Sequence, residues 1–256
     1  MKKRNTYYHI VFGRPALLKS ILMSTFLGLS YYFRVPIEVI TRSNMGERYF
    51  NVFLTSVIGI ILLVVPTLYA TNYMGNIDYG KLFINYGTWY LYTFLFLYSA
   101  FLRWREIRNN PSVWDMQRFS LSAGDPHRLL FKFRISKDNQ NSRYMATIIE
   151  PGVFIIAGII LTFLQQPIGW VLAGCGIIYS LGYTAAYYLS DQFVMDKIDE
   201  MICNEDMYNI FVNDIPSERG FEFHAKRPTD KGAREKLYDD YMDAEIVNDD
   251  EPQEVK

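Results

Sequence analysis

Reactive side chains lie closest together in the string Ser122-Ala123-Gly124-Asp125-Pro126-His127, where a hydroxyl, a carboxylate and an imidazole fall within six positions. These side-chain types form the triad of many hydrolases, in which a base activates a nucleophile. A triad is usually assembled from residues far apart in sequence, however, and Asp followed by Pro is typical of a turn or a helix N-cap. We therefore interpret the string as structural. An enzyme that uses Asp125 or His127 is the third of three functional hypotheses.

Glu150 and Cys175 are the other residues whose side chains could take part in a reaction. Glu150 precedes an apolar run and could carry protons, although a capping or interfacial carboxylate is the more common arrangement. Cys175 has no partner in its apolar run that would make it a nucleophile. The three histidines, His9, His127 and His224, are far from one another, so no metal-ligand spacing appears. The sequence predicts no catalytic residue, no cofactor and no metal site.

Four apolar runs are the elements that must position any such residue: residues 52–69, 86–102, 152–164 and 168–189. A helix needs about 20 residues to cross the hydrocarbon core of a bilayer. None of the runs has Asp, Glu, Lys or Arg in its interior, and only Gln165-Gln166-Pro167 separates the last two. The fold class predicted is therefore an all-α integral membrane protein, with about four transmembrane helices in two helical hairpins.

The orientation follows from the Lys and Arg residues beside the runs, because cytoplasmic loops carry an excess of them. Residues 103–149 hold nine basic and four acidic residues, whereas residues 70–85 hold one Lys and one Asp. We expect the first segment to be cytoplasmic and the second external. The C-terminus then lies in the cytoplasm. Residues 34–48 and the N-terminus are expected on the same side. The expected location is the cell inner membrane.

The same basic segment offers an alternative interpretation as a nucleic-acid surface. Trp104, Trp114 and Phe119 lie among its arginines and could stack on bases. Because these residues flank membrane runs, orientation and contact with anionic lipid explain them better. We expect the lipid bilayer to be a partner and nucleic acid not to be one.

Residues 15–33 form an ambiguous N-terminal helix within the segment 1–49. Lys19 interrupts their apolar pattern, while Ser20, Ser24 and Gly28 make a small-residue stripe of the kind that lets membrane helices approach closely. A spanning helix would place the basic N-terminus outside. An interfacial helix avoids that conflict, and both interpretations remain open.

The cytoplasmic insert, residues 103–149, contains an alternating pattern from 128 to 136 that predicts a strand with one apolar face. Residues 137–142 predict a turn, and residues 144–149 a returning strand, so we expect a small β-hairpin. Such a hairpin needs a membrane surface, helix or partner to cover its apolar side. Glu150-Pro151-Gly152 then opens the second hairpin of helices, with Pro in the first turn.

The segment after residue 189 is expected to continue as an amphipathic cytoplasmic helix over 191–213, which would put Cys175 and Cys203 on one helix, too far apart to pair. The tail from 214 to 256 has 13 acidic and 7 basic residues, and we expect it to be largely disordered. Residues 233–246 could form a short amphipathic helix. The hairpins occupy 50–102 and 150–190.

The leading functional hypothesis is a non-enzymatic membrane subunit that scaffolds a larger assembly, such as a secretion or conjugation complex, through its insert and tail. The expected partners are other protein subunits or copies of this chain, and no small-molecule substrate is indicated. A small oligomeric channel or transporter is the alternative. Small residues of the last two runs could line a path, although helix packing explains them better: Gly158, Gly169, Ala173, Gly174, Gly176 and Ser180. Apolar runs free of ionisable residues disfavour transport.

Overall fold

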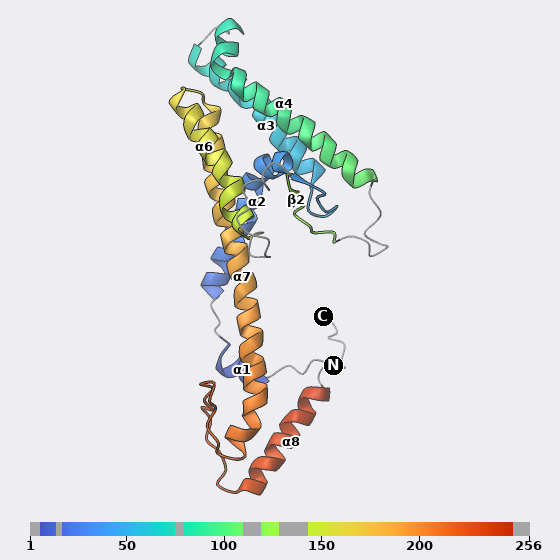
Figure 1. Cartoon of the computed structure of the whole chain (residues 1–256), viewed down its shortest axis with the longest axis vertical. Coiled ribbons are helices and arrows are strands. Elements are labelled where there is room, and N and C mark those ends of the chain that lie inside the picture. The colour runs from blue at the N-terminus through green and yellow to red at the C-terminus, as the bar shows by residue number, and fades with distance from the viewer. Residues whose placement is uncertain (1–5, 14–16, 75–78, 110–118, 128–142, 248–256) are drawn as a thin grey trace. The chain divides into compact units, whose positions relative to one another are not determined.

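The computed structural model describes residues 6–13, 17–74, 79–109, 119–127 and 143–247 (Figure 1). Most of this chain is helical, with one two-stranded antiparallel sheet. The elements, in chain order, are α1 (Thr6–Val11), α2 (Leu17–Thr41), β1 (Arg42–Ser43), α3 (Val52–Met74), α4 (Tyr79–Asn109), β2 (Asp125–Pro126), the π-helix η3 (Met145–Ile149), α6 (Glu150–Phe163), α7 (Ile168–Phe211) and α8 (Lys231–Val247). The chain divides into two compact units. Unit 1 comprises residues 1–19 and 188–256, and unit 2 comprises residues 20–187.

Three helical segments are long and apolar enough to cross a membrane: Val52–Tyr69 in α3, Met145–Phe163 across η3 and α6, and Ile168–Phe211, which is α7. These confirm three of the four expected apolar helices. The fourth, residues 86–102, is helical as expected but belongs to the 31-residue α4, which is not among the three. Its tyrosines, Trp89 and Trp104 make it less apolar than its neighbours.

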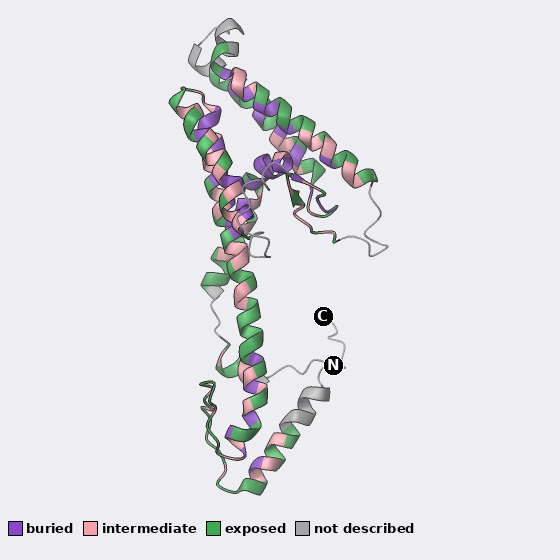
Figure 2. Ribbon diagram, in the orientation of Figure 1, coloured by how far each residue is buried: buried purple, intermediate pink, exposed green. Residues whose placement is uncertain are grey.

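Helices α3 and α4 form the first hairpin, side by side in Figure 1. α3 begins at Val52 because the Asn51 side chain accepts the Leu54 N–H at 3.1 Å, which satisfies a donor that the first helical turn leaves unpaired. Trp89 on α4 donates its indole N–H to the Leu62 carbonyl of α3 at 2.7 Å. In unit 2, buried residues concentrate where helices meet, and outward faces are exposed (Figure 2).

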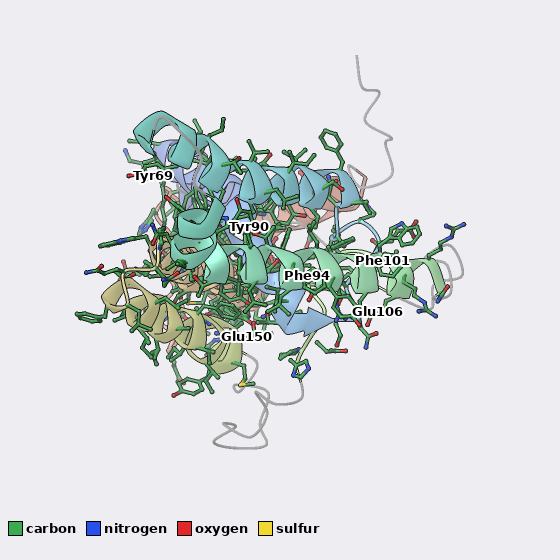
Figure 3. All side chains as sticks on the ribbon, turned by 90° about the horizontal axis from the view of Figure 1, so that it is seen from above. Tyr69, Tyr90, Phe94, Phe101, Glu106 and Glu150 are labelled. Atoms are coloured by element: carbon green, nitrogen blue, oxygen red, sulfur yellow. The ribbon has the colours of Figure 1, made fainter. Side chains whose placement is uncertain are left out.

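The outward face of α4 is apolar and aromatic. Figure 3 follows its side chains from Tyr90 through Phe94 and Phe101 to Glu106. Phe94 is 67% exposed and Phe101 is 53% exposed. Large apolar side chains left uncovered at this density are typical of a surface that meets lipid or another protein.

Helices α6 and α7 form the second hairpin, as Gln165-Gln166-Pro167 predicted. Gln165 has φ of 60° in the connecting turn. Small residues allow the backbones to approach: a Cβ on Gly158 would lie 2.6 Å from the Ala173 nitrogen, and one on Gly169 would lie 2.5 Å from the Thr162 nitrogen. Gly176 and Ser180 also lie at this contact, since a Cβ on Gly176 would be 2.7 Å from Ile155 Cγ1.

Helix α2 extends eight residues beyond the expected end at 33, so Arg34 lies within this helix. The expected stripe of Ser20, Ser24 and Gly28 is not where α2 packs most closely, because nothing lies within 4 Å of a Cβ on Gly28. Ser30 makes the close contact instead, with its Oγ 2.9 Å from a Cβ built on Gly182 of α7. α2 is not among the three segments apolar enough to span.

The expected β-hairpin is not formed as predicted. Residues 128–142 lie outside the described residues, but the expected second strand, 144–149, is helical and includes η3. Helix is favoured there because the segment runs directly into α6 and buries Met145 and Ala146 on one side. The strands described in this structure are β1 and β2, which pair Arg42 with Pro126 and Ser43 with Asp125.

Unit 1 contains α1, the later part of α7 and α8, and its packing corrects the expectation of a largely disordered tail. Tyr7 of α1 stacks on Phe223 with ring centroids 4.8 Å apart, and Phe211 of α7 contacts the same ring at 5.1 Å. Asp214 accepts a hydrogen bond from Arg234 of α8 at 2.6 Å. The first part of the acidic tail is thus held by aromatic packing and by its own arginines, and the chain is helical up to residue 247. Residues 248–256 lie outside the described part. Helix α8 confirms the short helix expected over 233–246, and α7 confirms the continuation past 189.

Candidate functional site: a buried polar cluster in unit 2

Seven charged and aromatic polar side chains gather inside unit 2, where α2 and β1 meet η3, α6 and α7. We call them the polar cluster: Arg34, Glu38, Arg42, Tyr49, Glu150, Tyr179 and Tyr183. The local structure explains the convergence. Arg34 and Glu38 are four apart on α2, as are Tyr179 and Tyr183 on α7, and residues four apart share one face of a helix.

The first half of the cluster is an ion pair closed by a tyrosine. Arg42 places Nε 2.9 Å and Nη2 2.8 Å from Glu150 Oε2, and Tyr179 donates its hydroxyl proton to the same oxygen. Glu150 and Tyr179 are fully buried, and the Arg42 side chain is 6% exposed. Away from water this pairing is required, because an isolated buried carboxylate carries a large desolvation penalty.

The second half surrounds Glu38. Tyr49 donates to Glu38 Oε2 at 2.8 Å, and Tyr183 donates to Glu38 Oε1 at 3.0 Å. Arg34 lies one helical turn away, with Nε 3.8 Å from Glu38 Oε1. Burial, followed by the nearby Glu38 carboxylate, raises the pKa of Tyr49 above its ordinary value, so this phenol remains a neutral donor.

Aromatic rings join the two halves. The guanidinium carbon of Arg42 lies 4.7 Å from the Tyr183 ring centroid, and that of Arg34 lies 4.8 Å from the same centroid. The Tyr179 and Tyr183 rings are 5.0 Å apart. Two arginines and two glutamates balance in charge, which makes the polar cluster a neutral, water-poor network rather than a charged cleft.

Two atoms of the cluster are buried with no hydrogen-bond partner in the described structure: Glu150 Oε1 and Arg34 Nε. Both donors to Glu150 use its other oxygen. A buried carboxylate oxygen without a donor is costly, and such an atom is a place for a water molecule. Beside Glu38 and Tyr49 there is a cavity of about 10 Å³, which is room for a single water.

In the described residues, the hydrolase-like string makes local contacts and contacts with the end of α2. Ser122 Oγ accepts the Gly124 N–H at 3.2 Å, and Asp125 accepts from the Asn44 side chain at 3.2 Å. His127 donates its backbone N–H to the Thr41 carbonyl at 2.8 Å, beside the β1–β2 pair. The string is a strand and turn that docks on the end of α2, in agreement with the structural interpretation.

Glu150 is the first residue of α6, at the position expected for a capping carboxylate, and its side chain is fully buried and paired with Arg42. The apolar segment begins at Met145 rather than at residue 152, so this glutamate lies within a candidate span. The absence of ionisable residues from span interiors, which had disfavoured transport, therefore does not hold.

Cys175 packs among Ile37, Ala146 and Tyr179, and Cys203 lies further along α7 in the other unit, with no disulfide between them. Trp114 of the proposed nucleic-acid surface lies outside the described residues. Within the described residues, no group of three or more His, Cys, Asp or Glu side chains could hold a metal ion. Comparison with protein-family models, curated proteins and solved structures finds no match.

Proposed function

We propose that the chain is a non-enzymatic integral membrane subunit of the cell inner membrane that anchors or scaffolds a larger assembly. The observation that carries this proposal is the way the polar cluster uses its charges. Arg42 and Glu150 neutralise one another, and Glu38 is held by Tyr49 and Tyr183. These contacts fix β1, α6 and α7 to one another, which suits a rigid membrane body more than a path for a solute.

In this proposal α3, α4, α6 with η3, and the first part of α7 are the four spans, and α2 is either interfacial or a fifth. Residues 103–149 and the C-terminal part face the cytoplasm. Membrane integration is supported by three apolar segments and by large exposed side chains such as Phe94 on α4 and Ile156 on α6.

The docking elements are the cytoplasmic insert and unit 1. Unit 1 is a separately packed body in which α1 and the C-terminal chain meet around the Tyr7–Phe223 stack. Helix α7 begins in unit 2 and ends in unit 1, so a partner that binds unit 1 would be connected to the membrane-spanning part of the chain. Leu237 on α8 and Met201 on α7, 49% and 61% exposed, are the apolar positions that a partner could cover.

Purification of the tagged full-length chain from native membranes tests the proposal. We expect defined protein subunits to copurify in constant ratio after crosslinking in mild detergent. Leu237→Glu should weaken this recovery without changing membrane insertion, because it places a charge on an exposed position of α8. Glu235→Gln on the same helix is the matched control. A chain that purifies alone and monodisperse contradicts the scaffold role.

A second candidate, a small oligomeric channel or transporter, is favoured by the unpartnered Glu150 Oε1 inside an apolar segment. Flux of protons or small ions into proteoliposomes that contain only this protein tests it. Glu150→Gln keeps the side-chain shape and should abolish such flux. Because Arg42 then loses its counterion, the stability of the variant in detergent is measured alongside. If wild-type proteoliposomes are as tight as empty ones, this candidate fails.

A further inference from the structure

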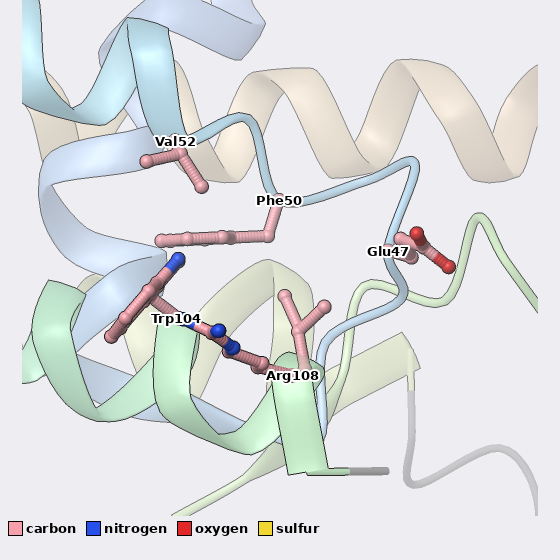
Figure 4. Close-up of a pocket in the computed structure, with 6 residues that line it drawn as sticks. Glu47, Phe50, Val52, Trp104 and Arg108 are labelled. Atoms are coloured by element: carbon pink, nitrogen blue, oxygen red, sulfur yellow. The ribbon is translucent and has the colours of Figure 1, made fainter. Parts of the chain in front are cut away.

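A surface pocket of about 380 Å³ lies in unit 2 between the start of α3 and the end of α4. Its lining combines apolar, aromatic and charged side chains: Glu47, Phe50, Val52, Trp104, Ile107 and Arg108. Figure 4 shows Trp104 and Glu47 at opposite sides of the pocket, with Phe50 between them. None of these residues belongs to the polar cluster.

The pocket lies at the depth where an apolar helix enters a membrane. Val52, in its lining, is the first residue of the candidate span Val52–Tyr69. α4 pairs with α3 through Trp89 and Leu62, so its end near Trp104 lies beside the start of α3. Tryptophan is enriched at membrane–water interfaces. The lining is therefore at headgroup level if α3 spans.

Arg108 is the cationic side chain of the pocket lining, which also includes one carboxylate, Glu47. The Arg108 guanidinium carbon lies 5.4 Å from the Trp104 ring centroid, and among the described residues no carboxylate pairs with Arg108. The nearby Glu106 is occupied, because both its oxygens accept from Arg103 at 2.7 and 2.6 Å. Arg108 thus keeps its N–H donors for a ligand, and guanidinium matches phosphate oxygens well.

The apolar part of the pocket suits acyl chains. Phe50 is 6% exposed and forms the floor, while Val52 leads into the apolar face of α3. An occupant that fits must carry an anionic phosphate at Arg108 and a hydrocarbon portion over Phe50 and Val52. Free phosphate would leave the apolar floor uncovered, and a fatty acid alone would not need a guanidinium.

We propose that this pocket binds one anionic phospholipid of the cytoplasmic leaflet, with the lipid phosphate at Arg108 and the glycerol and first acyl carbons against Trp104, Phe50 and Val52. The site rests on the proposed membrane topology but not on the scaffold role. It would anchor the α3–α4 hairpin at a fixed depth, because the lipid contacts both helices.

Native mass spectrometry of the full chain with phosphatidylglycerol or phosphatidylcholine tests the site. Wild type should retain one phosphatidylglycerol selectively, and Arg108→Gln should weaken this binding by about tenfold because a charge-assisted hydrogen bond is lost. Arg105→Gln removes another exposed arginine of α4, one that does not line the pocket, and should bind like wild type. Equal losses in both variants, or equal retention of both lipids, overturn the proposal.

Glu47→Gln provides an independent measurement, since Glu47 is the carboxylate in the lining. Its removal should strengthen phosphatidylglycerol binding by reducing repulsion. If it instead weakens binding and phosphatidylethanolamine is preferred, the ligand is zwitterionic and the proposal is wrong. Glycerol phosphate without acyl chains should not compete; if it does, the site recognises the phosphate alone. Selective lipid binding by a chain that copurifies with no partner would reject the scaffold role and leave this site intact.

Discussion

Arg42 and Glu150 are separated by 108 positions in the chain, yet two guanidinium nitrogens of the arginine contact one oxygen of the glutamate, at 2.9 and 2.8 Å. The pair joins β1, directly after the end of α2, to the first residue of α6. Since both side chains are buried, removal of one partner leaves the other charge without water or a counterion. The pair thus makes the arrangement of unit 2 depend on both residues together.

Arg42→Met should destabilise the protein by about 3 to 5 kcal/mol, the usual cost of leaving a buried charge unpaired. The double variant R42M/E150M should be much closer to wild type, because it removes both charges. Unfolding in mixed micelles with increasing dodecyl sulfate measures the difference. Arg105→Met, at an exposed position, is the control and should change stability by less than about 0.5 kcal/mol. A double variant as unstable as R42M would show that the pair itself does not set the cost.

Gly176→Leu should separate α6 from α7. A Cβ at Gly176 already lies 2.7 Å from Ile155 Cγ1 and 3.2 Å from the Pro151 carbonyl oxygen, so a larger side chain must displace the facing helix. We expect a loss of about 1 to 3 kcal/mol in detergent. Gly174→Leu is the matched control on the same helix, because nothing lies within 4 Å of its Cβ. Identical melting of the two variants would refute this contact.

The topology predicts which positions react with a membrane-impermeant thiol reagent in intact cells. In a background without Cys175 and Cys203, a cysteine at Gln165 should be labelled from outside, because the proposed topology places the turn between α6 and α7 on that side. Cysteines at Leu121 and Glu218 should be labelled only after the membrane is opened. External labelling at Leu121 would show that the orientation in the membrane is the reverse of the proposed one.

Acid should release α8 from the end of α7. The hydrogen bond from Arg234 lowers the pKa of Asp214 below its ordinary value of 3.8. A depressed carboxyl pKa stabilises the folded state above the unfolded value, and this contribution is lost as the pH falls below 3.8 and through the lowered folded pKa. Spin labels at the exposed positions Met201 and Leu237 should give a narrow distance distribution at neutral pH and a broad one in strong acid.

Asp214→Asn is the control for this measurement. Asp214 has φ of 59°, a left-handed conformation that asparagine also tolerates, so the substitution removes charge without backbone strain. The distribution should then be broad at every pH. If the variant and wild type respond to acid alike, other carboxyl groups control the contact.

Sequence patterns predicted the elements whose signals are local. The apolar run at 52–69 became most of α3, and the short link at 165–167 fixed α6 and α7 as neighbours. The register of η3 could not be predicted, because an alternating pattern upstream favoured a strand and the burial of Met145 and Ala146 depends on tertiary packing. The packing of Phe221 and Phe223 on α1 was missed for the same reason, since their partners are at the other end of the chain.

The polar cluster was also missed, although the sequence contains a signal for part of it. Arg34, Glu38 and Arg42 recur every fourth residue, as do Tyr179 and Tyr183, and each series marks one face of a helix. Read singly, the arginines indicated only a cytoplasmic segment. The pairing of Arg42 with Glu150 could not be foreseen, because the span around Glu150 begins earlier than its apolar content suggested.

The π-helix η3 has a consequence for insertions and deletions in this region. Its five residues make a wider turn than an α-helix, which amounts to one extra residue ahead of Glu150. Deleting one residue there would restore α-helical geometry. The residues just before the deletion would then be rotated by roughly 100° around the helix axis. Thr147, whose carbonyl accepts the Ser180 hydroxyl at 2.6 Å, would be carried away from α7. The number of residues in this segment, more than their identity, thus sets whether Thr147 faces α7.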